Sequence, residues 1–472
     1  MFYDVGKRKI CRKTRIILLT GFILTLLTLA STLSIAIENI CLSSDKTDNN
    51  GTGFFQVTQI NDRWCFIDPD GNPFFSTGIC GISAKGGYAP DLGYSPYHRN
   101  IIELYGDNET WANVTHGRMI SWGFNTIASG DKYIKATGLP YTLNLGMAGA
   151  NWVTGEVPDY FSDEWIQRTD RIGREICMNL SEDKLLIGYF LDNELHWGPD
   201  WRTLQDLFDD YCNLSYDSPG KTVLVDFLRD RYDNNISMFN IVWGTSFNSF
   251  NEILYVSRLG VWPYTVRARN DRAAFIFVVA EQYFKTCRST IHKYDSNHLI
   301  LGARFQSYIT PWEVVEACGP YVDVVSMNHY PARPLVFPFA LIMQDALGFI
   351  RPTSFLQDYY DITGKPILIS EFYFRAKDSG LPNTKPSRLF MPVVKTQKQR
   401  ALCYELIIRG FISKPYSVGY HWFAYIDQPY TGRFDGENSN IGVVNVMDEP
   451  YQELISRMTI VNNLAQKNVK NL

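Results

Sequence analysis

The stretch IGYFLDNELHW, from Ile187 to Trp197, changes abruptly from apolar to polar side chains. The apolar run begins at Leu185 and has the length and composition of a strand that is buried on both faces. Asp192, Asn193 and Glu194 follow at its carboxyl end, where burying polar groups costs free energy unless they have a function. Because catalytic groups lie at the carboxyl ends of the strands in an α/β barrel, this stretch predicts a barrel strand ending in a functional carboxylate.

A second stretch has the same form. KPILIS, residues 365–370, is an apolar strand pattern that ends directly in Glu371. Two glutamates at the ends of buried strands can face each other across one barrel mouth. Glycoside cleavage uses such a pair, since one carboxyl group protonates the leaving oxygen and the other attacks the sugar carbon. Taken singly, Glu194 could equally be an N-cap or an ion-paired loop carboxylate, and Glu371 a strand-end salt bridge.

Strand and helix patterns alternate along the rest of the chain, which predicts a parallel sheet. Eight such strands predict closure into a (β/α)8 TIM barrel. A hairpin around the Asp-Gly turn at residues 68–72 precedes the barrel, and a helix over 451–464 follows it. The expected barrel strands are residues 76–79, 123–127, 141–145, 185–191, 299–304, 322–327, 366–370 and 417–422.

The segment between the fourth and fifth expected strands is too long for one crossover helix. Residues 195–298 therefore predict a helical insertion on the catalytic face. Two amphipathic stretches within it, residues 222–232 and 273–291, have helical spacing.

The amino-acid composition is that of an ordinary globular protein. Of 472 residues, 45% are hydrophobic and 20% are charged, which suits a sizeable core. The net charge of −4 shows no excess of basic residues that could bind phosphates, so we expect no nucleic-acid partner. The seven histidines are scattered without a His-x-x-x-His pair, and the nine cysteines have no zinc-type spacing, so we expect no metal and no cofactor.

The first residues differ in kind from the rest. Residues 1–15 are a basic tail, and the uncharged, mostly apolar residues 16–37 would span about 33 Å as a helix, enough for a bilayer core. We expect a signal-anchor at 16–37, a linker at 38–53 and an extracytoplasmic catalytic domain at 54–472. A cleaved signal peptide, which would give a secreted protein, is the alternative. Six glycosylation sequons follow, at Asn50, Asn108, Asn113, Asn179, Asn213 and Asn235.

From about Arg63 to its end, the chain resembles clan A retaining glycoside hydrolases, and most closely the family-fifty β-agarase-like proteins. The motifs that carry the resemblance are GYFLDNEL, SEF and the long C-terminal set YHWFAYIDQP, TGR and DGEN, at residues 188–195, 370–372, 420–429, 431–433 and 435–438. The resemblance covers about four fifths of the chain, and its C-terminal set is the most specific part.

The resemblance implies roles for individual residues. Glu194 would be the acid/base and Glu371 the nucleophile of a retaining double displacement, with carboxyl groups roughly 5–5.5 Å apart. Asn193 would bind the sugar 2-hydroxyl, Tyr330 would orient Glu371, and Arg304 would stabilise the carboxylates. Trp422 would be a stacking platform under the reactive sugar. Core packing explains Tyr330 almost as well, and a structural ion pair explains Arg304 equally well. For Trp422, packing at the top of the barrel is the less favoured alternative. Further expected substrate-binding residues, without assigned roles, are His196, Trp197, His329, Asp427, Gln428, Arg433 and Glu437.

Two other functions fit the same residues. A catalytically inactive glycan-binding barrel is disfavoured because both carboxylates are present, and a transglycosylase would use the same pair. The expected substrate is a β-linked polysaccharide or oligosaccharide, with β-galactosides first.

Overall fold

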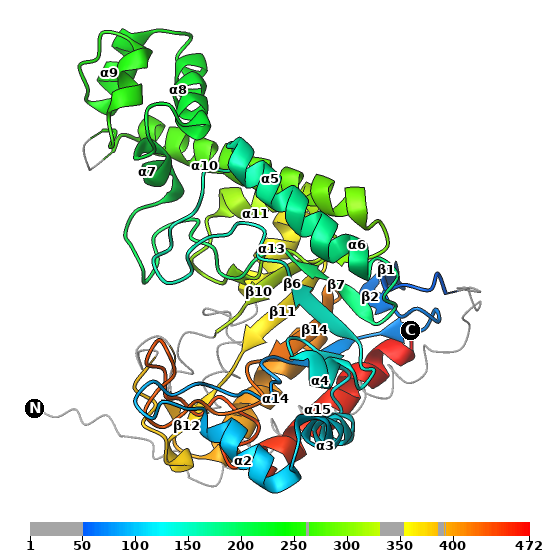
Figure 1. Cartoon of the computed structure of the whole chain (residues 1–472). Coiled ribbons are helices and arrows are strands. Elements are labelled where there is room, and N and C mark those ends of the chain that lie inside the picture. The colour runs from blue at the N-terminus through cyan, green and yellow to red at the C-terminus, as the bar shows by residue number, and fades with distance from the viewer. Residues whose placement is uncertain (1–50, 261–263, 331–353, 386–390, 392) are drawn as a thin grey trace, which may run out of the picture. The chain divides into compact units, whose positions relative to one another are not determined.

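Nine short strands, each parallel to its neighbours, form one curled sheet (Figure 1). The structure is a computed structural model that describes residues 51–260, 264–330, 354–385, 391 and 393–472. The order across the sheet is β8-β7-β6-β5-β4-β14-β11-β10-β9. These strands are β4 (Ser76–Ile79), β5 (Thr126–Ile127), β6 (Tyr141–Asn144), β7 (Leu186–Phe190), β8 (Leu299–Ile300), β9 (Phe305–Gln306), β10 (Val325–Asn328), β11 (Ile367–Phe372) and β14 (Ser417–Trp422).

The predicted closed eight-stranded barrel is wrong, because the strand expected over 299–304 is broken. Gly302 and Arg304 have φ angles of 82° and 48°, which lie outside the extended region and end the strand geometry. As a result β8 pairs with β7, β9 pairs with β10, and no ladder joins β8 to β9 in the described part of the chain. The sheet is therefore a curled half-barrel whose two edge strands follow each other in sequence, connected by residues 301–304.

The predicted fold class also included a transmembrane segment, and this part is corrected too. The expected span at residues 16–37, the basic tail before it and most of the linker after it lie outside the described residues. Within the described ranges, no helix is both long and apolar enough to cross a membrane. The fold class that the described residues support is a mixed α/β unit with a curled parallel sheet.

A small antiparallel sheet closes the amino-terminal end of the strands. It contains β1 (Gln56–Ile60), β2 (Arg63–Ile67) and β3 (Pro73–Phe74), with β2 and β3 forming the hairpin expected around residues 68–72. Its side chains form a separate apolar cluster with residues in or next to the parallel strands: Phe55, Phe66, Ile187, Phe190, Leu301, Val324, Leu368 and Val418. Because this end is filled, a site formed by the sheet must lie at the carboxyl ends of its strands.

Helices cover the outer face of the sheet and bury the larger apolar core against it. α14 and α15 lie together along one side, next to α3 (Figure 1). Outside the insertion the helices are α2 (Pro96–Tyr105), α3 (Asn108–Ser121), α4 (Lys132–Lys135), α5 (Asp163–Ile172), α6 (Met178–Leu180), α11 (Trp312–Cys318), α13 (Ser354–Thr363), α14 (Gln397–Ile412) and α15 (Gln452–Lys470). A further two-stranded ladder, β12 (Arg375–Ala376) with β13 (Val393–Val394), follows β11.

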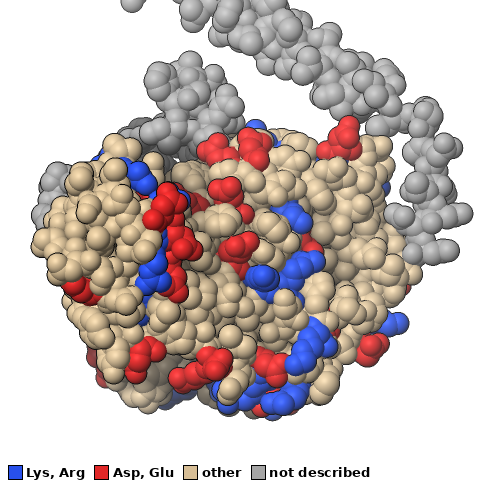
Figure 2. All heavy atoms as spheres, turned by 90° about the horizontal axis from the view of Figure 1, so that it is seen from above, with Lys and Arg blue, Asp and Glu red and all other residues tan. Residues whose placement is uncertain are grey.

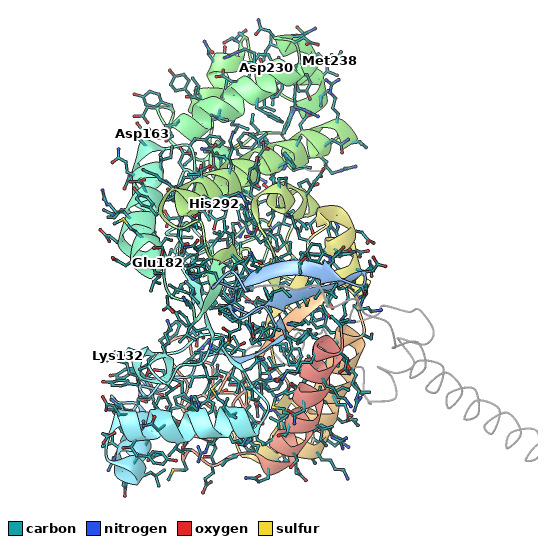
Figure 3. The ribbon with its side chains drawn as sticks, turned by 90° about the vertical axis from the view of Figure 1, so that its right-hand side faces the viewer. Lys132, Asp163, Glu182, Asp230, Met238 and His292 are labelled. Atoms are coloured by element: carbon teal, nitrogen blue, oxygen red, sulfur yellow. The ribbon has the colours of Figure 1, made fainter. Side chains whose placement is uncertain are left out.

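The predicted helical insertion between β7 and the next strand is present. It holds α7 (Leu207–Cys212), α8 (Pro219–Arg231), α9 (Ile236–Trp243) and the long α10 (Val266–Tyr294). α8 and α9, marked by Asp230 and Met238 in Figure 3, lie at the end of the described unit that is farthest from Lys132. α10 runs back to the sheet, where its Tyr283 hydroxyl donates to Asp192 at the end of β7. The insertion is therefore anchored at the carboxyl edge of the sheet.

Candidate active site

Glu371 lies near the carboxyl end of β11, opposite Asn328 of β10. Its Oε1 accepts from the Arg304 guanidinium, and its Oε2 accepts from the Tyr330 hydroxyl at 2.5 Å. The side chains of Arg304 and Glu371 are each 9% exposed. Hydrogen bonds on both oxygens restrict rotation of the side chain. The Glu371 carboxyl group is thus held in a defined orientation.

Glu194 follows β7 and is held mainly through its backbone. Its carbonyl oxygen accepts from Arg202 Nη2 at 2.8 Å and from Gln306 Nε2 at 3.2 Å. Glu194 is half-buried. Its carboxyl group accepts one hydrogen bond, from Asn328 Nδ2 to Oε1 at 2.9 Å. The Glu194 carboxyl group is therefore less strongly bound than that of Glu371 and remains available to exchange a proton.

The surroundings raise the pKa of Glu194 to about 7. Burial is the largest cause, and the negative charge of Glu371 adds to it. The hydrogen bond from Asn328 and the positive charges of Arg304 and Arg202 act in the opposite direction. A carboxyl group with a pKa near neutral can be protonated when substrate binds and deprotonated later, as a general acid/base requires.

Two residues of this site have a strained backbone. Glu194 and Arg304 have φ angles of 50° and 48°, in the left-handed region that side chains other than glycine rarely adopt. The two are also joined directly, since the Glu194 amide donates to the Arg304 carbonyl at 3.3 Å. Left-handed residues of this kind persist where surrounding contacts hold them, and they cluster at functional sites.

Asn328 connects the two glutamates, and the sequence reasoning assigned it no role. Its amide nitrogen contacts Glu194 and also Asn193 Oδ1, at 3.1 Å. Its Oδ1 accepts from the hydroxyl of Ser370, the residue before Glu371, at 2.9 Å. The signal that could have identified it is the same as for the glutamates, a polar residue at the carboxyl end of an apolar strand.

Asp192 lies at the same edge but is enclosed. Its Oδ2 accepts from the Ala148 amide at 2.8 Å and from the Tyr283 hydroxyl, and burial raises its pKa to about 7. These contacts tie β7 to the loop after β6 and to α10, so the role of Asp192 is to position the strand end.

Trp422 is fully buried, unlike an exposed stacking platform. Its indole nitrogen donates to the Ile441 carbonyl at 2.9 Å, and its ring lies against Phe372, Tyr404 and the Arg400 guanidinium. The next residue, Phe423, is half-buried and faces Tyr373, whose ring packs against Tyr330. Phe423, which follows β14, is therefore linked through Tyr373 to Tyr330, the donor to Glu371, and the sequence reasoning missed it.

The C-terminal motif forms a polar network. Arg433 pairs with Glu437 at 2.8 Å, and Gln428 donates to the same carboxylate at 2.5 Å. Burial lowers the pKa of Arg433, but the carboxylates of Asp435 and Glu437, with a smaller contribution from Glu371, raise it above its ordinary value. Asp427 is instead buried, accepting from Asn440, the Gly442 amide and Tyr451, and it fastens the C-terminal loop.

The remaining candidates after β7 and β10 are buried. His196 lies between Asp200 at 3.3 Å and Asp210 at 3.7 Å. Trp197 stacks on Phe284 in the core. The His329 amide donates to the Glu371 carbonyl at 2.8 Å, so this residue holds the end of β11 through its backbone.

In the described ranges, no group of three or more histidine, cysteine or acidic side chains could hold a metal ion. Each of the seven described cysteines is free and buried.

No family model matches the chain, but individual proteins do. It is 27% identical to β-agarase B of Vibrio sp. (strain JT0107) over 86% of this chain and 47% of the relative. It is also 27% identical to β-agarase A of the same strain, over 82% and 43% of the two chains. The chain therefore spans about half the length of the curated relatives it matches.

Solved structures agree with these relatives. An exo-β-agarase has a TM-score of 0.74 and 26% identity, covering 89% of this chain and 66% of the other. The agarase AgWH50C has a TM-score of 0.73 and 27% identity, covering 90% and 67%. These comparisons confirm the resemblance to the family-fifty β-agarase-like glycoside hydrolases that the sequence predicts.

Proposed function

We propose that this chain hydrolyses β-glycosidic bonds of an agarose-type polysaccharide by a retaining double displacement. Glu371 is the nucleophile and Glu194 the acid/base. The observation that carries the proposal is that the two carboxyl groups have different surroundings. Glu371 receives one hydrogen bond on each oxygen from Arg304 and Tyr330, whereas Glu194 is desolvated and its pKa is raised to about 7.

The reaction then takes two balanced steps. Glu371 attacks the anomeric carbon while the leaving oxygen takes the proton from Glu194, which gives a glycosyl ester on Glu371 and a free alcohol. In the second step Glu194, now ionised, removes a proton from water, and the hydroxide oxygen displaces Glu371 from the anomeric carbon. The sugar leaves with its original anomeric configuration, and both carboxyl groups return to their starting states.

The substrate class is supported by the relatives. The β-agarases A and B match most of this chain, and their names give agarose-type polysaccharide as the first substrate to test. On the side of the molecule that Figure 2 shows, seen from above the view of Figure 1, positive and negative side chains are interspersed.

We also propose that the protein acts outside the cytosol. The sequons at Asn113, Asn179, Asn213 and Asn235 have exposed asparagines, as glycosylation requires. Protease protection in sealed vesicles tests this location. A lumenal catalytic unit supports it, and a unit that is digested from the cytosolic side refutes it.

The experiment that tests the activity is proton NMR of agaro-oligosaccharide hydrolysis, followed from the first turnover. We expect the β-anomer to form first and then to mutarotate. The Glu371→Gln variant should form no product. Initial release of the α-anomer would contradict the retaining mechanism. Binding without turnover in a folded wild-type protein would favour a glycan-binding role, and longer products would favour transglycosylation.

A further inference from the structure

Two tryptophans, Trp152 and Trp201, lie together on the loops that follow β6 and β7. Their ring centroids are 6.1 Å apart with an interplanar angle of 58°. Trp201 is 58% exposed, although large aromatic side chains are usually covered in a folded protein. The exposed Trp201 ring leaves an apolar aromatic surface open to a ligand.

The contacts beneath Trp201 are well organised. The Arg202 guanidinium carbon lies 4.7 Å from the centroid of the Trp201 ring, and the Arg202 side chain is only 2% exposed. Arg202 also donates to the Trp152 carbonyl at 3.1 Å and forms an ion pair with the buried carboxylate of Asp200. One buried cation therefore supports Trp201 and fixes the loop that carries Trp152, so the pair is held in place before any ligand binds.

The same cation connects the pair to the reaction centre. Arg202 Nη2 donates to the Glu194 carbonyl at 2.8 Å, next to the proposed acid/base carboxyl group. The donors to Glu371 come instead from Arg304, between β8 and β9, and from Tyr330, after β10. In a double displacement the acid/base lies beside the leaving oxygen, opposite the face that the nucleophile attacks.

We propose that Trp152 and Trp201 form a binding subsite for the neutral glycan chain on the leaving-group side of the cleaved bond. A pyranose ring presents an apolar C–H face to the exposed indole of Trp201, and Trp152 limits its position from the side. Arg202 is a positioning residue that couples occupation of this subsite to the backbone of Glu194. This inference rests on the proposed function, since it assumes that Glu194 protonates the leaving oxygen.

The test is isothermal titration calorimetry of a disaccharide and a hexasaccharide from agarose, in the full chain carrying Glu371→Gln to prevent turnover. We expect the hexasaccharide to bind more tightly than the disaccharide. Adding Trp201→Ala should weaken hexasaccharide binding about tenfold, the scale of one lost aromatic contact. Trp201→Phe, which keeps an aromatic face, should restore most of the affinity.

Two control variants separate this subsite from general effects. Leu204, 89% exposed on the same loop, tests for loop damage, and Tyr255, 73% exposed in the insertion, tests for any exposed aromatic. We expect Leu204→Ala and Tyr255→Ala to bind the hexasaccharide like the parent. If Trp201→Ala also binds like the parent, the subsite is refuted while the proposed function stands. If the parent binds neither sugar, the proposed function is refuted and the subsite with it.

Discussion

Removing the amide of Asn328 should shift the pH dependence of the proposed hydrolysis in one direction. Asn328 donates to Glu194 Oε1 at 2.9 Å, and this hydrogen bond lowers the pKa of Glu194, which is about 7 in the intact site. In Asn328→Ala the bond is lost while burial and the Glu371 charge remain. The pKa of Glu194 must therefore rise.

The size of the shift follows from the energy of the bond. A hydrogen bond to a charged group contributes about 1.5–3 kcal/mol, and about 1.4 kcal/mol corresponds to one pH unit. Because Glu194 must be protonated to act as the acid, its pKa sets the basic limb of the kcat/KM profile. We expect this limb to move from about pH 7 to about pH 8–9, together with a lower maximum because Asn193 also loses a partner.

The assay is kcat/KM for an agaro-oligosaccharide from pH 4 to pH 10, with thermal unfolding recorded at each pH. Asn144→Ala is a matched control, because Asn144 is also the last residue of a parallel strand but is exposed. It should leave the profile unchanged. A basic limb in Asn328→Ala that stays in place or moves to lower pH would refute the assignment of Glu194 as the acid.

Three further predictions concern other parts of the site. Glu194→Ala should slow substrates with poor leaving groups far more than activated aryl glycosides, measured as kcat/KM, and equal slowing would remove Glu194 as the acid. Tyr330→Phe removes the hydroxyl that donates to Glu371 and should lower kcat/KM about ten- to a hundredfold with an unchanged melting temperature; a loss below about twofold would contradict the orienting role. Burial raises the pKa of Asp192 to about 7. Between about pH 4 and pH 7, the folded state therefore keeps a proton on Asp192 that the unfolded state loses. The free energy of unfolding consequently falls as pH rises through this window. The free energy of unfolding of Asp192→Asn, measured with urea at pH 5 and pH 7, should therefore fall less steeply with pH than that of the wild type, by about 1.4 kcal/mol per pH unit. An unchanged dependence on pH would be inconsistent with a buried, protonated carboxyl group.

Much of the site could be predicted because it follows from local sequence pattern. A short apolar run that ends in polar residues placed β7 and β11 correctly, and with them Glu194 and Glu371 at one edge of the sheet. The Asp-Gly turn gave the hairpin, and the long interval after Glu194 gave the helical insertion. In each case one periodicity or one turn is enough to specify the element.

The features that were missed depend on tertiary contacts. Arg304 takes a left-handed conformation within an expected strand, which breaks the strand and brings its carbonyl to the Glu194 amide. The conformational propensity of arginine does not predict this left-handed conformation, because the surrounding contacts impose it. The choice between Trp422 and Phe423 depends on which face of β14 turns inward, and a register error of one residue exchanges them.

A mechanism-based label shows whether Glu371 forms a covalent bond to the sugar. The protein is incubated with a 2-deoxy-2-fluoro-β-galactoside that has an activated leaving group, digested, and examined by peptide mass spectrometry. We expect one fluorosugar per chain on the peptide that contains Glu371, and none in Glu371→Gln. A label on Glu194 instead, or a folded and hydrolytically active protein that takes up no label, would contradict this expectation.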